Sequence, residues 1–417
     1  MTPGRSPDPT ATSVRPCRSD AIPHRTVESL SCGRVWGITA WGPVMHTHHH
    51  GTLDTLPTPA LVLDAARVER NISRLADYAR SHGIGLRPHT KTHKSVEIAR
   101  RQLAAGAVGL TVAKVGEAET LLPAFDDAPA DILIAYPTVD FARASQVADL
   151  AHRGTIRVAL DTQAAVAAVA GAASRAGSTI GVLVDIDVGP GRTGLPDVDA
   201  LVELATAVTH APGLRLDGIF FYPGHIWDAP TAQASRLQAV ADTLAGAIDR
   251  FDRLGLSRGI VSGGSTPTAY QSHLIPQATE IRPGTSVFND LNTLRAGFCS
   301  ADDIAATILA TVISDAVAGQ VVLDAGSKTL TSDRCVPEPE SGYGFLPDYP
   351  DAVITKLTEE HAQVDIRGCS KPPAVGDRVT IIPNHICPCV NLQDTTWWQE
   401  PDGSLRPLPV DARGRLS

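Results

Sequence analysis

With 417 residues, the chain is long enough for two domains and a large hydrophobic core. Its formal net charge of −9 and the lack of a basic stripe argue against nucleic acid as a partner, and no apolar run reaches the roughly 18 residues of a membrane-spanning helix, so no membrane association is expected. The seven cysteines are odd in number and scattered, which argues against a disulfide framework and favours a cytoplasmic protein.

The first 54 residues differ in composition from the rest of the chain. They are rich in Pro, Ser, Thr and Arg, lack hydrophobic periodicity, and include a histidine-rich run at residues 46–50. They contain no continuous apolar segment of the kind that a secretory signal needs. We therefore expect residues 1–54 to form a disordered extension with a solvated histidine run, and a natural start at Met45 is an alternative.

From residue 58 the hydrophobic pattern becomes regular. A strand is expected at residues 60–63, followed by a helix over residues 65–81 with Asp64 as its N-cap. Further helices are expected at residues 115–122, 141–152, 164–175 and 232–254. The strands that alternate with helices are expected at residues 85–88, 108–113, 131–136, 156–160, 180–187, 216–222, 259–262 and 278–282.

These strands are continuous Val, Ile and Leu runs, as expected for parallel strands buried on both faces. Eight of them in about 200 residues predict a closed (β/α)8 TIM barrel, which we assign to residues 55–285. An open doubly wound sheet is the alternative, but its glycine fingerprint is missing after the first strand. Strands without intervening helices follow, and they predict a mostly antiparallel β domain over residues 286–417.

Two lysines and two histidines surround a proline after the strand at residues 85–88, in the sequence Arg-Pro-His-Thr-Lys-Thr-His-Lys. Strand ends of this kind carry the chemistry of a barrel. Lys91 can form an imine with a carbonyl if burial and neighbouring cations keep its amine neutral. A solvated basic loop is the alternative, and Lys94, which opens the next helix, is expected to be solvated.

Two glycine-containing loops predict a phosphate site. Free backbone N–H groups, small side chains and a helix start make a phosphate cradle, and the first loop follows the seventh strand, where such barrels usually bind phosphate. The second loop follows the eighth strand, and an ordinary turn is the alternative for either loop. The candidate residues are Gly263, Gly264, Ser265, Thr266, Gly284 and Thr285.

Arg192 and Tyr222 follow the fifth and sixth strands. The arginine can hold a phenolic oxygen or a carboxylate, or it can pair with Asp185 or Asp187. The tyrosine can contact a flat cofactor or belong to the core. The sequence leaves both alternatives open.

His385 and Cys387 predict a metal site. They lie two residues apart at the end of an expected strand, so both side chains should share one face. Imidazole and thiolate together suit zinc, and two protein ligands leave positions for water or substrate. A buried histidine beside inert cysteines is the alternative, and Cys389 is either a third ligand or part of the core.

Together these residues resemble the D-threonine aldolase and D-serine dehydratase family, which shares the alanine racemase fold. The similarity extends over residues 58–391, and residues 87–94 are its most specific part. The resemblance implies pyridoxal 5′-phosphate (PLP) bound through Lys91, phosphate contacts in the two loops, and ring contacts at Arg192 and Tyr222. It also implies a divalent metal near the cofactor at His385 and Cys387, a D-amino acid substrate, and a homodimer.

The resemblance leaves two reactions open. The aldolases look as though they carry His-x-Asp at the metal, whereas the dehydratases use His-x-Cys and zinc, as this chain would. Residues 281–285 look more like the aldolase side. We expect a D-serine dehydratase-like elimination that releases ammonia and a 2-keto acid, with zinc favoured over manganese or magnesium.

Retro-aldol cleavage to glycine and an aldehyde is the alternative reaction, in which His89, His93 or His225 would be the base. Two other classes are more distant. A racemase of this fold would need a second acid/base and no metal. A non-catalytic PLP-binding protein would keep Lys91 but usually lacks the second β domain.

Overall fold

The computed structural model describes residues 51–126 and 128–417. The histidine-rich run at residues 46–50 and most of the predicted N-terminal extension lie outside the described residues. The described end of that extension, residues 51–54, instead begins the folded part, since the Gly51 carbonyl accepts a hydrogen bond from the Leu405 amide at 3.1 Å. In the part of the chain that the structure describes, no helix is long and apolar enough to cross a membrane.

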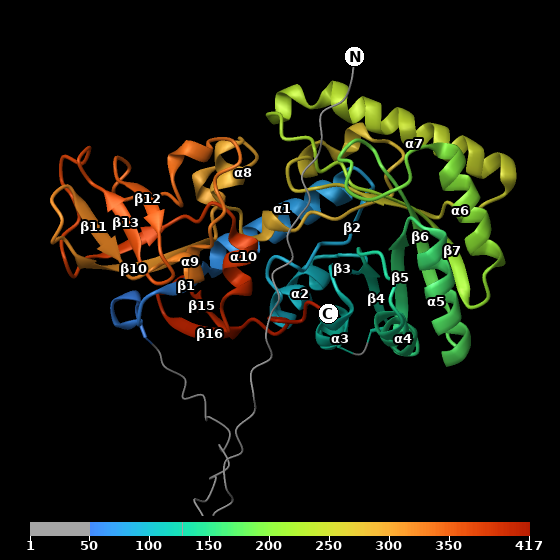
Figure 1. Cartoon of the computed structure of the whole chain (residues 1–417), viewed down its shortest axis with the longest axis horizontal. Helices are drawn as coiled ribbons and strands as arrows, with labels where there is room; N and C mark the ends of the chain where they lie inside the picture. Colours follow the sequence, from blue (N-terminus) through green and yellow to red (C-terminus); the bar gives the residue numbers. More distant parts are fainter. Residues whose placement is uncertain (1–50, 127) are drawn as a thin grey trace, which may run out of the picture. The chain divides into compact units, whose positions relative to one another are not determined.

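A sheet of eight parallel strands has the order β2-β9-β8-β7-β6-β5-β4-β3 (Figure 1). Its strands are β2 (Gly85–Leu86), β3 (Leu110–Val112), β4 (Ala130–Ile134), β5 (Gly154–Leu160), β6 (Ile180–Ile186), β7 (Leu214–Phe221), β8 (Ile260–Gly263) and β9 (Glu280–Ile281). The edge strands β2 and β3 meet through hydrogen bonds from Val108 N to Leu86 O (2.8 Å) and from Thr111 N to Pro88 O (2.9 Å). The sheet therefore closes, which confirms the predicted barrel against the open doubly wound alternative.

Helices cover the outside of this barrel (Figure 1). They are α1 (Ala65–Ser81), α2 (Val96–Ala104), α3 (Val115–Leu121), α4 (Phe141–Leu150), α5 (Gln163–Ala176), α6 (Val198–His210) and α7 (Ala234–Leu254). Helix α1 has the predicted bounds: the Asp64 carboxylate accepts the Arg67 amide at 2.9 Å, and the apolar face packs into the core. Strands β2 and β9 are shorter than predicted. Each ends two residues before a proline, which lacks an N–H donor, and β9 also begins two residues later than predicted.

The second sheet is mostly antiparallel, as predicted, and has the order β12-β13-β11-β10-β1-β15-β16, with β14 paired to β10. Its strands are β1 (Ala60–Asp64), β10 (Ala306–Ser314), β11 (Gln320–Leu323), β12 (Val353–Leu357), β13 (Ala362–Asp365), β14 (Arg378–Ile381), β15 (Thr395–Gln399) and β16 (Leu405–Pro409). Buried side chains from β1, β10, β11, β13 and β14 form its core.

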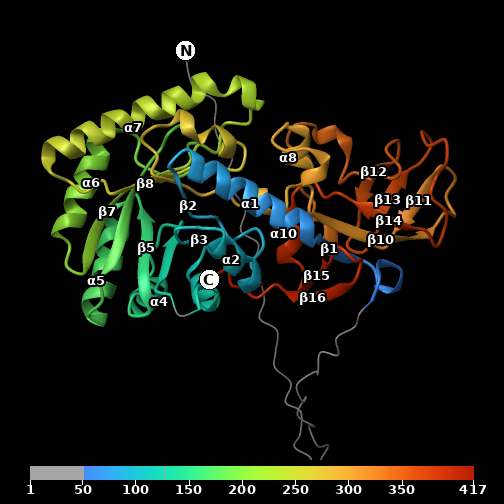
Figure 2. The same ribbon diagram turned by 180° about the vertical axis from the view of Figure 1, so that it is seen from behind.

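Strand β1 corrects the predicted barrel boundary at residue 55. It lies in the second sheet, where Leu61 pairs with Ile308 of antiparallel β10 and Val62 pairs with Trp397 of parallel β15. Helix α1 then leads from this sheet to the barrel (Figures 1 and 2). A strand buried on both faces has the same apolar sequence pattern in either sheet, so its own sequence does not predict which strands it pairs with. The second domain is therefore built from residues on both sides of the barrel.

Candidate active site

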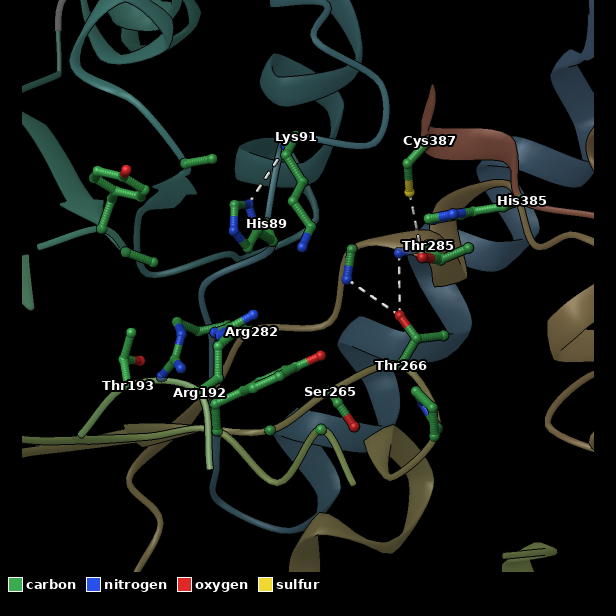
Figure 3. Close-up of a pocket in the computed structure, with 18 of the residues that line it drawn as sticks. His89, Lys91, Arg192, Thr193, Ser265, Thr266, Arg282, Thr285, His385 and Cys387 are labelled. Carbon is green, nitrogen blue, oxygen red and sulfur yellow. Dashed lines mark hydrogen bonds between the residues drawn. The ribbon is translucent and has the colours of Figure 1, made fainter. Parts of the chain in front are cut away.

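A cavity of about 560 Å³ lies where residues that follow the barrel strands meet residues of the second domain (Figure 3). The barrel contributes Lys91 after β2, Tyr136 after β4, Arg192 after β6 and Tyr222 after β7. The second domain contributes Asp290, Asn292, Thr293, Val336, His385 and Cys387. The carboxyl ends of parallel strands are where barrels of this kind place their chemistry.

Lys91 and His89 lie next to each other in the loop after β2, with the Lys91 side chain reaching into the cavity (Figure 3). The Nδ1 atom of His89 accepts the Lys91 amide at 3.4 Å. Burial lowers the pKa of His89 well below its usual value, and the charges of Lys91 and Arg282 lower it further. His89 is therefore neutral, and its proton is on Nε2 because Nδ1 is an acceptor. In this arrangement the ring is a hydrogen-bond donor rather than a base.

The other two candidate histidines do not line the cavity. His93 is buried, its Nδ1 accepts the Ser95 amide at 3.1 Å, and its Nε2 lies 3.2 Å from Gln102 Oε1. Burial lowers the pKa of His93 to about 4. His225 packs against Gly189, where an added Cβ would come within 2.7 Å of its ring. The structure thus corrects the prediction for His93, whose hydrogen bonds hold the start of α2.

Lys94 is buried, which corrects the prediction that it is solvated. Its backbone has a φ of 53°, and its Nζ lies 2.7 Å from Glu117 Oε1. The other oxygen of Glu117 accepts the amides of Ala113 (2.7 Å) and Lys114 (3.2 Å), which follow β3. This buried ion pair fixes the loop that carries Lys91 to the end of the neighbouring strand.

Arg192 stacks on Tyr222, with the guanidinium carbon 4.4 Å from the ring centroid. Within the described residues it forms no salt bridge with Asp185 or Asp187. Asp187 instead accepts the amides of the following glycine loop, and Asp185 accepts the Thr193 hydroxyl at 2.9 Å. The guanidinium is therefore available to a ligand in the cavity. Asp185 also lines the cavity, and burial raises its pKa to about 7.

The two predicted phosphate loops lie side by side. The Thr266 hydroxyl oxygen accepts the amides of Gly284 (3.3 Å) and Thr285 (3.1 Å), and both loops line the cavity. Gly264 has a φ of 93°, which favours glycine. Gly263 does not line the cavity, and its role is steric: an added Cβ would come within 2.0 Å of the Phe221 ring. Hydroxyls and backbone N–H groups thus gather at one place and fit a phosphate.

His385 and Cys387 were predicted to lie at the end of a strand, and the structure corrects this: they lie at the start of a helix. Residue 385 is the N-cap of α10 (Ile386–Asn391), because β14 stops before Pro383. Both side chains nevertheless line the cavity (Figure 3). Cys389 is fully buried, and its sulfur lies 3.4 Å from the Leu330 carbonyl oxygen and 3.2 Å from that of His385, so it belongs to the core.

The chemistry of this pair fits a metal. His385 Nδ1 lies 2.8 Å from Asp333 Oδ2, which leaves Nε2 for another partner, as in metal-binding histidines held by a carboxylate. Burial disfavours the Cys387 thiolate, but the hydrogen bond from His385 and the charges of His385 and Lys91 outweigh burial and lower the pKa of the thiol. Among the described residues, no group of three or more His, Cys, Asp or Glu side chains forms a metal cluster, so open positions would remain.

Several residues around this pair were missed by the sequence analysis. Asp333 and Val336 come from the loop after the short helix α9 (Ser327–Leu330), and Asp290 and Asn292 begin the short helix α8 (Leu291–Arg295). The Asp290 carboxylate accepts the Ile386 amide at 3.1 Å and so joins α8 to α10. None of these residues stands in a motif, and only the tertiary fold brings them to the cavity.

Comparison with known proteins gives two adjoining family matches. The model "Alanine racemase, N-terminal domain" matches residues 63–291, and "Putative serine dehydratase domain" matches residues 305–397. D-threo-3-hydroxyaspartate dehydratase of Delftia sp. strain HT23 is 36% identical over 359 residues, which cover 81% of this chain and 92% of that protein. This chain belongs to the D-threonine aldolase and D-serine dehydratase family. The predicted resemblance is confirmed, and the family implies PLP and a metal.

Solved structures of this family show the same fold. D-threonine aldolase from Filomicrobium marinum has a TM-score of 0.80 and 33% identity, over 88% of this chain and 98% of that chain. A D-threo-3-hydroxyaspartate dehydratase variant in which alanine replaces a cysteine, described as metal-free, has a TM-score of 0.79 and 32% identity, over 86% and 98%. The family members are lyases, which supports a PLP-dependent lyase over the racemase and non-catalytic alternatives.

Proposed function

We propose that the protein is a PLP- and metal-dependent lyase that eliminates ammonia from D-3-hydroxy amino acids, in the manner of a D-serine dehydratase. One observation carries this proposal: a single cavity joins Lys91, the two phosphate loops and the His385–Cys387 pair. The relatives named above act on substrates of this class, which adds support.

The residues of the barrel fit PLP. Lys91 would attach the cofactor, Ser265, Thr266 and Thr285 with the loop amides would hold its phosphate, and Arg192 would face an anionic oxygen. Bound PLP supplies an electron sink that eases bond breaking at the substrate α-carbon. The Lys91 amine is the group of this chain that we assign to take up the α-proton. The Nε2–H of His89 would donate a hydrogen bond to an anionic oxygen in the cavity.

His385 and Cys387 would hold the metal, which supplies a Lewis acid for the substrate β-hydroxyl. We favour zinc because a thiolate is a soft ligand, whereas manganese and magnesium prefer oxygen. Asp333 would orient His385 through Nδ1. The structure of the related dehydratase in which alanine replaces a cysteine is described as metal-free, and this supports a role of a cysteine in metal binding in that protein.

The placement of the histidines favours elimination over retro-aldol cleavage. Cleavage needs a base for the β-hydroxyl proton, and three histidines were candidates. His89 already carries its proton on Nε2, and His93 and His225 do not line the cavity. Elimination needs no such base, because hydroxide leaves with its proton and Lys91 handles the α-proton.

Product analysis tests the reaction. Purified protein supplied with PLP and either zinc or manganese would be given D-serine and D-threonine. We expect ammonia and a 2-keto acid, more with zinc, and loss of turnover in the presence of a chelator. Glycine and an aldehyde as the products would replace elimination by the aldolase reaction, and full activity without metal would remove the metal assignment.

The cofactor attachment has its own test. Lys91→Ala should abolish the visible absorbance of the protein after PLP is supplied and excess is removed. Lys328→Ala is a matched control, because this lysine pairs with exposed Glu359 and Glu360 of the second domain. A full-strength visible band in the Lys91 variant would contradict the assignment.

A homodimer and a cytoplasmic location remain predictions from the family resemblance and from the scattered cysteines. Light scattering on the eluted protein tests the first, and we expect twice the chain mass. A monomer with full activity would contradict it.

A further inference from the structure

One end of the cavity is built by the second domain. Asp290, Asn292, Thr293 and Val336 line it, together with His385 and Cys387. Asn292 lies next to the segment that carries His385 and Cys387, because its backbone amide donates to the Asn384 carbonyl at 3.2 Å. A substrate whose β-hydroxyl meets His385 and Cys387 would therefore bring the other group on its β-carbon toward Asn292.

The Asn292 amide has a fixed orientation. Its Oδ1 accepts the Val336 amide at 2.6 Å. A backbone N–H requires an acceptor, so the other end of the amide must be the NH₂ group. The Asn292 residue is only 5% exposed, yet Nδ2 has no hydrogen-bond partner among the described residues. A largely buried residue therefore presents an oriented donor to the cavity.

The neighbouring polar groups are already occupied. The Thr293 hydroxyl donates to the backbone carbonyl of Asp290 at 2.8 Å. The two carboxylate oxygens of Asp290 accept the backbone amides of Thr293 (3.0 Å) and Ile386 (3.1 Å). Val336 offers an apolar side chain. Among the described residues that line this end of the cavity, Asn292 is thus the one side chain, besides His385 and Cys387, that has a polar hydrogen without an acceptor.

We propose that Asn292 is a specificity-determining residue, which donates a hydrogen bond from Nδ2 to an acceptor on the β-substituent of the substrate. This inference rests on the proposed function. A donor that the bound substrate removes from water and leaves unpaired costs binding energy, so a substrate with an acceptor at this position is favoured over one with a methyl group. A β-carboxylate satisfies the donor, the methyl group of D-threonine does not, and D-serine carries only its hydroxyl on the β-carbon.

The test measures KM and kcat of the PLP- and metal-loaded enzyme for D-threo-3-hydroxyaspartate, D-threonine and D-serine. We expect the wild type to have its lowest KM for 3-hydroxyaspartate. Asn292→Ala should raise that KM by about tenfold to a hundredfold, because a hydrogen bond to a charged group is lost. The KM for D-serine should rise by a much smaller factor, since that substrate carries no second group on its β-carbon that would reach the amide.

Asn292→Asp is a second variant with nearly the same shape. One carboxylate oxygen still accepts the Val336 amide, while the other turns a negative charge toward the cavity. It should raise the KM for 3-hydroxyaspartate more than the alanine variant does, and by a larger factor than it raises the KM for D-serine. Arg295→Gln is the matched control: it loosens the same short helix from Glu338 without lining the cavity, and it should not alter the order of preference.

A KM that rises equally for all three substrates, or for none, would overturn the inference. If the wild type turns over none of these compounds, the proposed function fails. The inference is then tested by calorimetry, which measures the affinities of the three compounds for the wild type and for the two Asn292 variants. A loss of affinity that is largest for 3-hydroxyaspartate supports the inference, and equal changes for all three compounds overturn it.

Discussion

Lys94 has an unusual environment for a lysine: its side chain and that of Glu117 are 5% and 2% exposed. Two charges removed from water are tolerable only as a pair. Glu117 also accepts two backbone amides, so the pair belongs to a network that ties the Lys91 loop to the end of β3. Its main effect is on the position of Lys91, not on charge in the cavity.

We predict that Lys94→Met destabilises the protein by about 3–5 kcal/mol, because Glu117 would remain buried without its partner. Denaturant unfolding of the wild type and the variant measures this. Lys328→Met, which removes an exposed pair, serves as the control and should have little effect. An unchanged free energy of unfolding for the Lys94 variant would show that the network contributes nothing.

A second residue-scale prediction concerns pH. Burial raises the pKa of Asp185 to about 7, above its value of about 4 in an unfolded chain. The folded state then binds a proton that the unfolded state lacks between these values, so this group makes the free energy of unfolding fall as pH rises from about 4 to about 7. Asp185→Asn should flatten this part of the profile of the cofactor-free protein. Parallel profiles for the two proteins would contradict the cause.

At the residue scale, the sequence predicted those side chains that stand in motifs. Lys91, Arg192 and Tyr222 meet in the cavity because the ends of parallel strands meet there. The prediction of His93 as a candidate base was wrong, because nothing in the sequence next to Lys91 indicates that the His93 side chain is buried in the core. The sequence also did not indicate Asn292 and Asp333, whose positions depend on contacts between distant segments.

At the scale of elements, the start of α10 is held from two sides. Asp290, the N-cap of α8, accepts the Ile386 amide, and Asp333 of the loop after α9 holds the His385 ring. The sequence predicted a strand here from the apolar residues before Pro383. Helix α1, by contrast, has its predicted bounds because both its cap and its apolar face lie within one segment.

We predict that Asp333→Ala weakens metal binding by about tenfold to a hundredfold, because the ring of His385 loses the carboxylate that orients it. Competition with a coloured zinc chelator measures the affinity. Asp348→Ala, a change in an exposed loop of the same domain, is the control. Equal affinities of the wild type and the Asp333 variant would remove this carboxylate from the site.

At the scale of the whole molecule, the two domains share chain segments and the cavity. Strand β1 lies in the centre of the second sheet, and α1 continues from it to the barrel. The sequence predicted both architectures, but it placed β1 on the wrong side of the boundary, because strand pairing depends on partners late in the chain.

This arrangement predicts a single cooperative unfolding transition, because the second sheet cannot open without freeing the segment that begins the barrel. Far-UV circular dichroism follows mainly the barrel helices. In a variant with phenylalanine at Trp36, Trp41 and Trp227, tryptophan fluorescence follows Trp397 and Trp398 of β15. The two curves should coincide in denaturant. Separate midpoints would show that the domains unfold independently.

The central place of β1 also has a consequence for biosynthesis. During translation this strand leaves the ribosome before the barrel, yet β10 and β15, which flank it, are made only afterwards. The backbone of β1 therefore has no neighbouring strand to pair with while the barrel segment emerges and folds. We infer that the nascent protein closes its second sheet last, after release of the carboxyl-terminal strands, and that the metal pair is assembled only at that final step.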